Sequence, residues 1–170
     1  MKLQRRLCAL ALCVCMLCSL AGVCYGVNVA GYSSWFAGDF TEMNTLGLIP
    51  DSFAGYNLKS DITRGEMCRL AVHAFEKITK DSIEPSRTDY FSDTSETVIL
   101  QAYEAGIVSG YPDGTFRPDQ KLTRAQAAQL VYRLLATPDN GTGACSYTDI
   151  AGQWYTQPIR ALCALGLFDN

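Results

Sequence analysis

The chain contains one histidine, His73, and little else from which a catalytic centre could be built. Without a second histidine or a nucleophile beside it, acid–base and nucleophilic sites cannot be assembled, so His73 is interpreted as a packing residue. The carboxylates are scattered over predicted loops without a facing pair, which disfavours a hydrolase. We therefore expect no enzymatic activity and no cofactor.

Cysteine is scarcer than its count of eight suggests, because five of the eight lie within the first 24 residues. The other three, Cys68, Cys145 and Cys163, are an odd number without a C-x-x-C spacing, which argues against a metal site or a disulfide-stapled miniprotein. Pairing of Cys145 with Cys163 and two free thiols are both compatible with the sequence.

The first 26 residues have the order of a secretory leader. Lys2, Arg5 and Arg6 precede an apolar run over 7–21, and small residues then lead to Gly26, after which we expect cleavage. The alternative is an uncleaved anchor, but the run is shorter than the roughly 20 residues that a membrane span needs. Membrane contact is expected only through this leader, if it is uncleaved.

Positive charge is in short supply once the leader is removed. The leader takes three of the 14 Lys and Arg and none of the 17 Asp and Glu, so the formal charge changes from −3 to −6. An acidic exported chain is poorly suited to nucleic acid or to anionic lipid. About 145 residues are enough for one compact core.

A repeat of about 60 residues organises the rest of the chain. Gly47, Gly106 and Gly166 each follow an apolar helical stretch, at separations of 59 and 60 residues. A fixed period predicts stacked copies of one supersecondary unit. We define unit one as 27–80, unit two as 88–137 and a partial unit three as 145–170.

Each unit is predicted to be helix, loop, helix, and the fold to be all-α, because no useful length of sequence alternates with a period of two. Glycine is predicted to end each first helix, and Tyr111-Pro112-Asp113-Gly114 is predicted to form a turn in which Asp113 bonds the local backbone. The residues predicted to face inward, helix by helix, are Val98, Ile99, Ala102, Tyr103 and Ala105; Ala127, Leu130, Val131, Leu134 and Leu135; and Met67, Leu70, Ala71, Ala74, Phe75 and Ile78.

Two matching tetrapeptides, 63–66 and 123–126, begin the second helices of units one and two. Thr63 with Glu66, and Thr123 with Gln126, have the spacing of a capping box, worth roughly 1 kcal/mol per helix. The cap does not explain the arginines between them, since a cation is slightly unfavourable in a first helical turn.

Arg64 and Arg124 therefore invite a second explanation. Free N–H groups at a helix N-terminus together with a guanidinium form a clamp for a carboxylate or phosphate. A structural salt bridge to a neighbouring unit explains the two arginines equally well. Both interpretations stay open at the level of the sequence.

Unit two closely resembles an S-layer homology repeat. The resemblance is carried by Phe91-Ser92-Asp93, by 105–118 (AGIVSGYPDGTFRP) and by Leu122-Thr123-Arg124-Ala125-Gln126. Parts of units one and three match as well. The resemblance implies three repeats, in which one helix of each joins a central three-helix bundle and the loops and second helices project as prongs.

The resemblance also implies a function: non-catalytic anchoring to the bacterial cell wall through a secondary wall polysaccharide that carries pyruvate ketals. It assigns the contact with the pyruvyl carboxylate to Arg64 and Arg124. Further groove or scaffold positions are Trp35, Trp154, Asp93, Asp149, Gly110 and Gly114. From residue chemistry alone, packing in the core or in a groove wall is the commoner role for the tryptophans, and helix capping for the two aspartates.

Two other functions are compatible with the sequence. The chain could be the remnant of a larger S-layer protein or wall-bound enzyme whose cargo domain is absent. It could also be a scaffold in which another protein chain supplies the missing second helix of unit three. The sequence does not give the oligomeric state.

Overall fold

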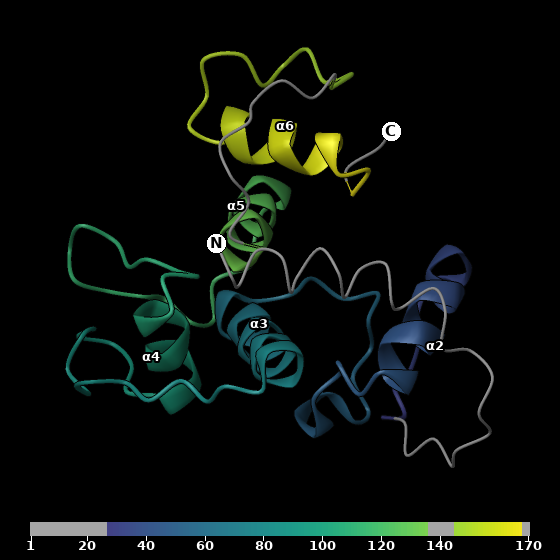
Figure 1. The fold of residues 1–170 in the computed structure, drawn as a ribbon. Helices are drawn as coiled ribbons and strands as arrows, with labels where there is room; N and C mark the ends of the chain where they lie inside the picture. The colour runs from purple at the N-terminus through teal and green to yellow at the C-terminus, as the bar shows by residue number, and fades with distance from the viewer. Residues whose placement is uncertain (1–26, 136–144, 168–170) are drawn as a thin grey trace.

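The computed structural model describes residues 27–135 and 145–167, which fold as short helices joined by long loops (Figure 1). Within these residues there is no β-strand, only two isolated bridges, so the all-α prediction is confirmed. No helix in the described part of the chain is long and apolar enough to cross a bilayer. The predicted leader lies outside the described residues. The elements in chain order are η2 (Ser34–Phe36), α2 (Ala37–Thr45), η3 (Asp51–Phe53), α3 (Arg64–Thr79), α4 (Thr97–Glu104), α5 (Arg124–Leu134) and α6 (Thr156–Ala164).

The first helices α2, α4 and α6 all end in the way the sequence predicts. Gly47, Gly106 and Gly166 follow their C-caps with φ of 65°, 70° and 68°. Glycine occupies this left-handed region without the steric cost that a Cβ would bring, and it therefore stops each helix at a defined residue.

The second helices α3 and α5 begin with the predicted capping boxes. Thr63 accepts a hydrogen bond from the backbone N–H of Glu66, whose side chain accepts from the N–H of Thr63. Thr123 and Gln126 repeat the arrangement at the start of α5. Each box satisfies two backbone donors that the helix itself leaves without a partner.

Helix packing crosses the boundaries between the sequence units. The closest helix pairs are α3 with α4 and α5 with α6, so that each second helix lies against the first helix of the next unit (Figure 1). The largest cluster of buried side chains accordingly combines Cys68 and Val72 of α3 with Ile99 and Leu100 of α4, above the fully buried Phe116. A central bundle with one helix from each unit stays a prediction.

This arrangement corrects several predicted inward faces. Cys68 and Val72 are buried although they were not predicted to be, because α3 also packs against α4, while Leu70 faces a separate cluster within unit one. On α4, Leu100 is buried, whereas Tyr103 is 38% exposed at the rim. On α5, Ala128 is buried in place of Ala127, because it packs towards α6. Ala105 is exposed because it caps the end of the short helix α4.

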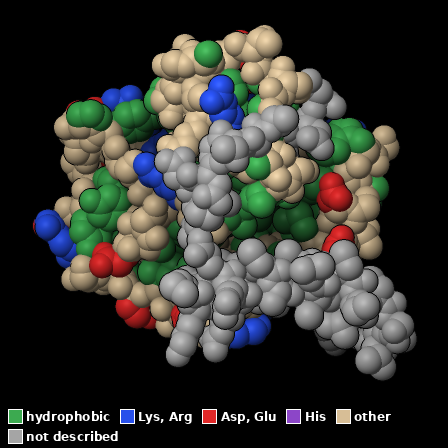
Figure 2. All heavy atoms as spheres, turned by 45° about the horizontal axis from the view of Figure 1, so that its top comes forward, with side chains coloured by type: hydrophobic (Ala, Val, Ile, Leu, Met, Phe, Trp, Pro, Cys, Tyr) green, Lys and Arg blue, Asp and Glu red, His purple; other side chains and the backbone are tan. Residues whose placement is uncertain are grey.

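The surface carries both signs of charge. On the face that Figure 2 shows, Lys and Arg side chains and Asp and Glu side chains appear at several separate places. Hydrophobic side chains reach the surface as well, among them Leu165 and Leu167 at the end of α6. The described side chains visible on this face form no broad basic patch of the kind that nucleic acid requires.

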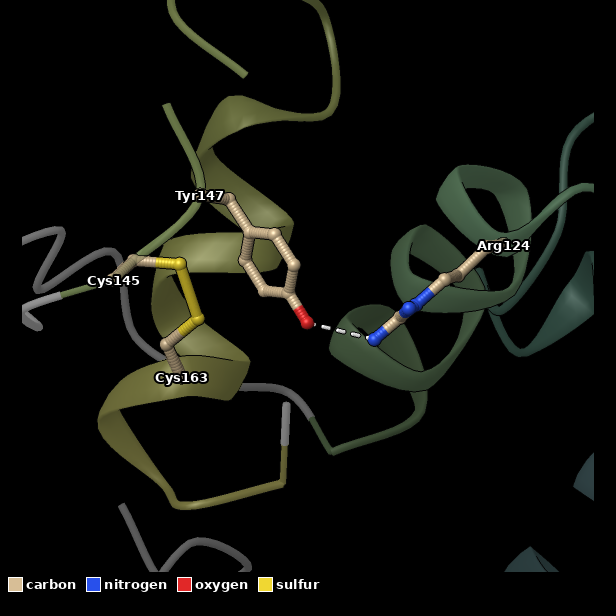
Figure 3. Close-up of a disulfide and its surroundings, with 4 residues drawn as sticks. All are labelled: Arg124, Cys145, Tyr147 and Cys163. Carbon is tan, nitrogen blue, oxygen red and sulfur yellow. Dashed lines mark hydrogen bonds between the residues drawn. A yellow bond between two sulfur atoms is a disulfide. The ribbon is translucent and has the colours of Figure 1, made fainter. Parts of the chain in front are cut away.

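A disulfide joins Cys145 to Cys163, a pairing that the sequence left open (Figure 3). The two Cα atoms are 5.6 Å apart, and the bond ties the segment before Tyr147 to α6. Cys68 is a buried free thiol, and burial raises its pKa to about 12. It is therefore not a reactive thiolate.

We predict that replacing both Cys145 and Cys163 by Ser lowers the free energy of unfolding by about 3 kcal/mol, because the bond closes a loop of 18 residues in the unfolded chain. Urea unfolding monitored by circular dichroism measures this. Dithiothreitol should destabilise the wild type by the same amount and leave the double variant unchanged. A wild-type midpoint that does not respond to reductant would contradict the prediction.

Candidate functional site

The N-terminus of α3 docks onto the loop of unit two. The backbone N–H groups of Arg64 and Gly65 donate to the carbonyls of Gln120 and Pro118, both at 2.9 Å, and the carbonyl of Ile62 accepts from the chain at 122. This corrects the expectation that the N–H groups at this helix end are free for a ligand. They are occupied because the loop of the next unit completes the helix start.

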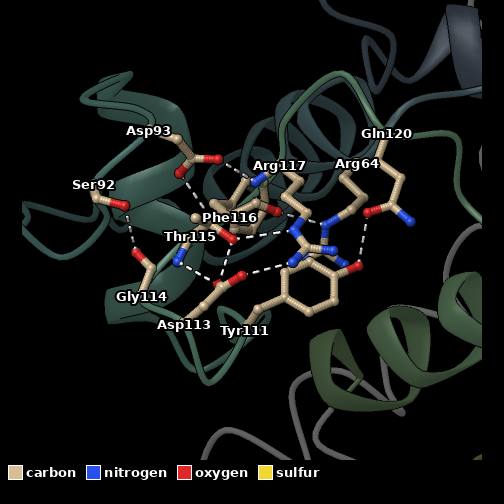
Figure 4. A network of polar contacts seen from close by, with 10 residues as sticks. All are labelled: Arg64, Ser92, Asp93, Tyr111, Asp113, Gly114, Thr115, Phe116, Arg117 and Gln120. Atoms are coloured by element: carbon tan, nitrogen blue, oxygen red, sulfur yellow. Dashed lines mark hydrogen bonds and ion pairs between the residues drawn. The ribbon is translucent and has the colours of Figure 1, made fainter.

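The Arg64 side chain extends the same contact (Figure 4). Its Nε donates to the carbonyl of Phe116 at 2.9 Å and its Nη2 to the carbonyl of Ser109 at 3.2 Å. Its guanidinium carbon lies 4.5 Å from the centre of the Phe116 ring and 4.9 Å from that of Tyr111. Among the described residues it has no ion pair, so the salt bridge that was one of the two interpretations of this arginine is not formed there, and bonds to neutral carbonyls take its place. Two of its five N–H donors are used and the charge is kept.

Asp93 holds the loop from the other side and does not cap a helix, since the N-cap of α4 is Glu96. Its carboxylate accepts from the backbone N–H groups of Phe116 and Arg117, both at 2.7 Å. Partial burial opposes ionisation, but the two N–H groups outweigh it and hold the pKa of Asp93 below its usual range. Asp93 therefore shapes the loop.

Asp113 forms the predicted turn with its own backbone. It accepts from the N–H and hydroxyl of Thr115 and pairs with Arg117 at 2.6 Å. These partners, the Thr115 hydroxyl first, lower the pKa of Asp113 to about 2. Arg117 has a φ of 60°, uncommon for a residue with a Cβ, and the two aspartates hold it there.

Gly110 and Gly114 give the loop its shape. A Cβ at Gly110 would lie 2.5 Å from the Phe91 ring, so only glycine allows the backbone to run so close to the core. Gly114 has a φ of 79° and closes the turn by donating to the carbonyl of Tyr111 at 3.0 Å. We therefore interpret both glycines as scaffold of the site.

A surface groove of about 230 Å³ opens beside this loop. The described residues that line it come from all three units and include two guanidinium groups, two side-chain amides and two aromatic rings, and none of them carries a carboxylate. A groove with these groups suits an anionic ligand that also has polar hydroxyls and a flat apolar face. Its polar and aromatic lining residues are Arg64, Arg133, Gln126, Gln129, Ser109, Tyr111 and Trp154.

The two tryptophans are exposed, so neither packs in the core, which was one of the two packing roles expected for them beside a place in the groove wall. Trp154 is 61% and Trp35 80% exposed. Each lies in a turn or short 3₁₀ segment before a helix, where the next residue, Tyr155 or Phe36, packs inward. Trp154 lines the groove and Trp35 does not.

Arg124 lies in a different environment from Arg64. Its Nη2 donates to the Tyr147 hydroxyl at 2.7 Å, and its guanidinium carbon is 5.5 Å from the centre of that ring (Figure 3). Arg124 does not line the groove. Asp149 is exposed and lies well before Tyr155, the N-cap of α6, so its assignment as a helix cap was wrong.

Three groove residues were missed from the sequence: Arg133, Gln129 and Ser109. The first two lie on α5 with Gln126 at spacings of three and seven residues, which places them on one helix face. That spacing was the available signal. Nothing in the sequence indicated that this face borders a groove.

The corresponding place in unit one is chemically different. A pocket of about 260 Å³ is lined there by Ile49, Ile62 and Leu70, the counterparts of groove positions in unit two. Its lining is largely apolar and includes the carboxylates of Asp61 and Glu66. The groove in unit two is therefore the better site for an anion.

Comparison with known proteins finds a domain family that matches most of unit two. Residues 88–128 match the S-layer homology domain. The amylopullulanase of Thermoanaerobacterium thermosulfurigenes is 31% identical over 112 residues, which are 62% of this chain and 6% of the relative. The S-layer protein of Bacillus thuringiensis subsp. finitimus is 39% identical over 64 residues, 38% of this chain and 8% of the relative.

A third relative, the cellulosome-anchoring protein of Acetivibrio thermocellus, is 26% identical over 123 residues, which are 70% of this chain and 27% of that protein. The chain thus spans a small part of each of these relatives. No solved structure matches the fold.

The acid stability of the loop provides a test of its network. Because the pKa of Asp113 is lowered to about 2 in the folded chain from an ordinary value of 3.8, its contribution is present above pH 4 and is lost as the pH falls towards 2. We predict that Asp113→Asn flattens the decrease of the urea midpoint between pH 4 and pH 2. Asp119→Asn, in the same loop, is the control and should keep the wild-type slope. Equal slopes for wild type and Asp113→Asn would contradict this role.

Proposed function

We infer that this chain anchors an exported protein to the bacterial cell wall by binding an acidic wall polysaccharide in the groove of unit two. The inference starts from the match of residues 88–128 to the S-layer homology domain. S-layer homology domains are anchoring domains of secreted, cell-surface proteins and are not catalytic. The observation that carries the proposal is a groove whose described lining includes two guanidinium groups and no carboxylate, in a chain whose net charge is negative.

Electrostatics favour an anion at this place. Two positive groups lie in a concave surface, where the field is focused and attraction is stronger than for isolated surface charges. Hydrogen bonds between a guanidinium and a carboxylate are roughly twice as strong as neutral ones. The acidic remainder of the chain repels anions elsewhere, which favours one binding position.

Arg64 is suited to this role because it is already positioned. Two carbonyls and two aromatic rings hold its guanidinium, so that little side-chain entropy is lost when a ligand binds. Its remaining donors form a planar fork that matches a carboxylate. We therefore assign the primary anion contact to Arg64, and to Arg124 a contact between units two and three.

A pyruvate ketal on the polysaccharide is the anion that we propose. It presents a planar carboxylate on a sugar ring, which complements a guanidinium fork beside an exposed indole. Trp154 supplies a face on which the sugar ring can stack, and Gln129 offers an amide for its hydroxyls. Support for pyruvate in particular comes from the resemblance of unit two to S-layer homology repeats.

We also propose that units 27–80, 88–137 and 145–170 are successive repeats of one kind. The shared αL glycines and the two capping boxes support this division. The amylopullulanase is far longer than this chain, since the matched 112 residues are 6% of it. A scaffold that binds a second protein chain stays an alternative hypothesis. If the chain forms a larger complex when it is mixed with a second S-layer homology protein, the scaffold is favoured.

The first test is a pull-down with purified cell-wall sacculi. We predict that the chain co-sediments with sacculi and that removing their pyruvate by mild acid lowers the bound fraction at least tenfold, because the carboxylate contact is lost. Arg64→Gln should lower it to a similar extent, while Arg124→Gln should keep most of the binding. Circular dichroism of both variants checks that they are folded.

Binding that survives removal of pyruvate would contradict pyruvate as the anion. Equal binding by Arg64→Gln and wild type would move the site away from the groove. A loss seen only in Arg124→Gln would assign the carboxylate to the junction of units two and three.

The tryptophans provide a matched pair of variants. Trp154→Ala should weaken binding to solubilised wall polysaccharide about fivefold, the value of a stacking contact near 1 kcal/mol. Trp35→Ala removes an indole that is even more exposed but lies outside the groove, and it should leave the affinity unchanged. Isothermal titration calorimetry measures both. Equal losses would show that indole exposure, and not the groove, governs binding.

A further inference from the structure

The groove contains a second guanidinium, Arg133, which adds to its positive charge but to which neither the repeat motif nor the proposed function assigns a specific ligand contact. Its Nη1 donates to the hydroxyl of Ser109 at 3.2 Å, and Arg64 donates to the carbonyl of the same residue at 3.2 Å. Two positive groups from α3 and α5 therefore converge on one loop residue. Neither has an ion pair within the described ranges.

The two arginines are held very differently. Arg64 is part-buried and fixed by carbonyls and rings, whereas Arg133 is exposed and has a single bond to a hydroxyl that can rotate. Two cations so close together repel each other unless an anion lies nearby. A fixed and an adaptable cation at one groove suit two separate anionic groups better than a single carboxylate.

Unit one provides an internal comparison. His73 occupies the position of Arg133 on α3, and its Nε2 lies 2.9 Å from the carbonyl of Gly47. A bond from the second helix back to the turn after the first helix therefore does not require a permanent cation. In unit one the His73 contact lies in a unit whose pocket is largely apolar and includes two carboxylates. In unit two the Arg133 bond borders a groove whose described lining residues include no carboxylate.

We propose that the groove takes a glycan segment with two anionic groups, one on Arg64 and the second on Arg133, and that Arg133 selects for this charge density. The inference rests on the proposed function, since it concerns the same groove. It adds that the polysaccharide must present acidic groups on neighbouring sugars. Arg133 contributes to specificity, and Arg64 remains the primary contact.

The test uses two synthetic disaccharides that differ only in carrying one or two pyruvyl ketals. By isothermal titration calorimetry at low salt, the wild type should bind the doubly charged probe about tenfold more tightly, the contribution of one further charge-assisted contact. Arg133→Gln should abolish this preference, because it should weaken binding of the doubly charged probe about tenfold more than binding of the singly charged probe. Added salt should weaken binding of the doubly charged probe more strongly than binding of the singly charged probe.

Two controls separate charge from structure. Ser109→Ala removes the partner that ties Arg133 to the loop and should keep the preference, because the charge remains. Arg87→Gln changes the net charge equally at an exposed pair with Asp89 outside the groove and should also keep it.

Equal wild-type affinity for both probes would overturn the inference, and so would an equal loss on both probes in Arg133→Gln. Either result leaves wall anchoring through Arg64 intact. If Ser109→Ala also loses the preference for the doubly charged probe, Arg133 only holds the loop in place through its hydrogen bond to Ser109 and does not select the ligand. A wild type that binds neither probe would contradict the proposed function as well.

Discussion

The structure depends on one contact, the docking of the N-terminus of α3 onto the loop of unit two. A helix start leaves backbone donors that must find partners when buried, and here the carbonyls of Pro118 and Gln120 supply two of them. The Arg64 side chain continues into the same loop and packs on Phe116, which is fully buried. Units one and two are thereby joined, and the same arginine forms one wall of the groove.

The junction of units two and three follows the same plan with other groups. Arg124 reaches the Tyr147 hydroxyl, α6 packs on α5, and the Cys145–Cys163 disulfide holds the intervening segment (Figure 3). The repeating unit of the sequence is therefore not the packing unit of the fold. Each second helix completes its core with the next unit, which explains how a groove can draw on residues from all three.

Local features could be predicted from the sequence because neighbouring residues determine them. Glycine after each first helix, the Thr-x-x-Glu/Gln boxes and the 111–114 turn need only the few residues around them. The burial of Cys68 and the exposure of Trp154 depend on which helix lies opposite, and a single sequence does not contain that information. Part of the site could be predicted for the same reason, because the repeated motif indicated Arg64. Arg133 lies on an ordinary helical face, and only the structure shows that it bonds Ser109 beside the groove.

The central claim is that acidic wall glycan binds at Arg64 in the unit-two groove. Its most direct test is a titration of ¹⁵N-labelled protein with solubilised wall polysaccharide fragments, followed through the side-chain N–H signals of arginine and tryptophan. We predict that the Arg64 Nε–H and the Trp154 indole N–H shift together and saturably, while the Trp35 indole does not move. Shifts confined to Trp35 or to the Arg124 side chain, with Arg64 unperturbed, would contradict the account.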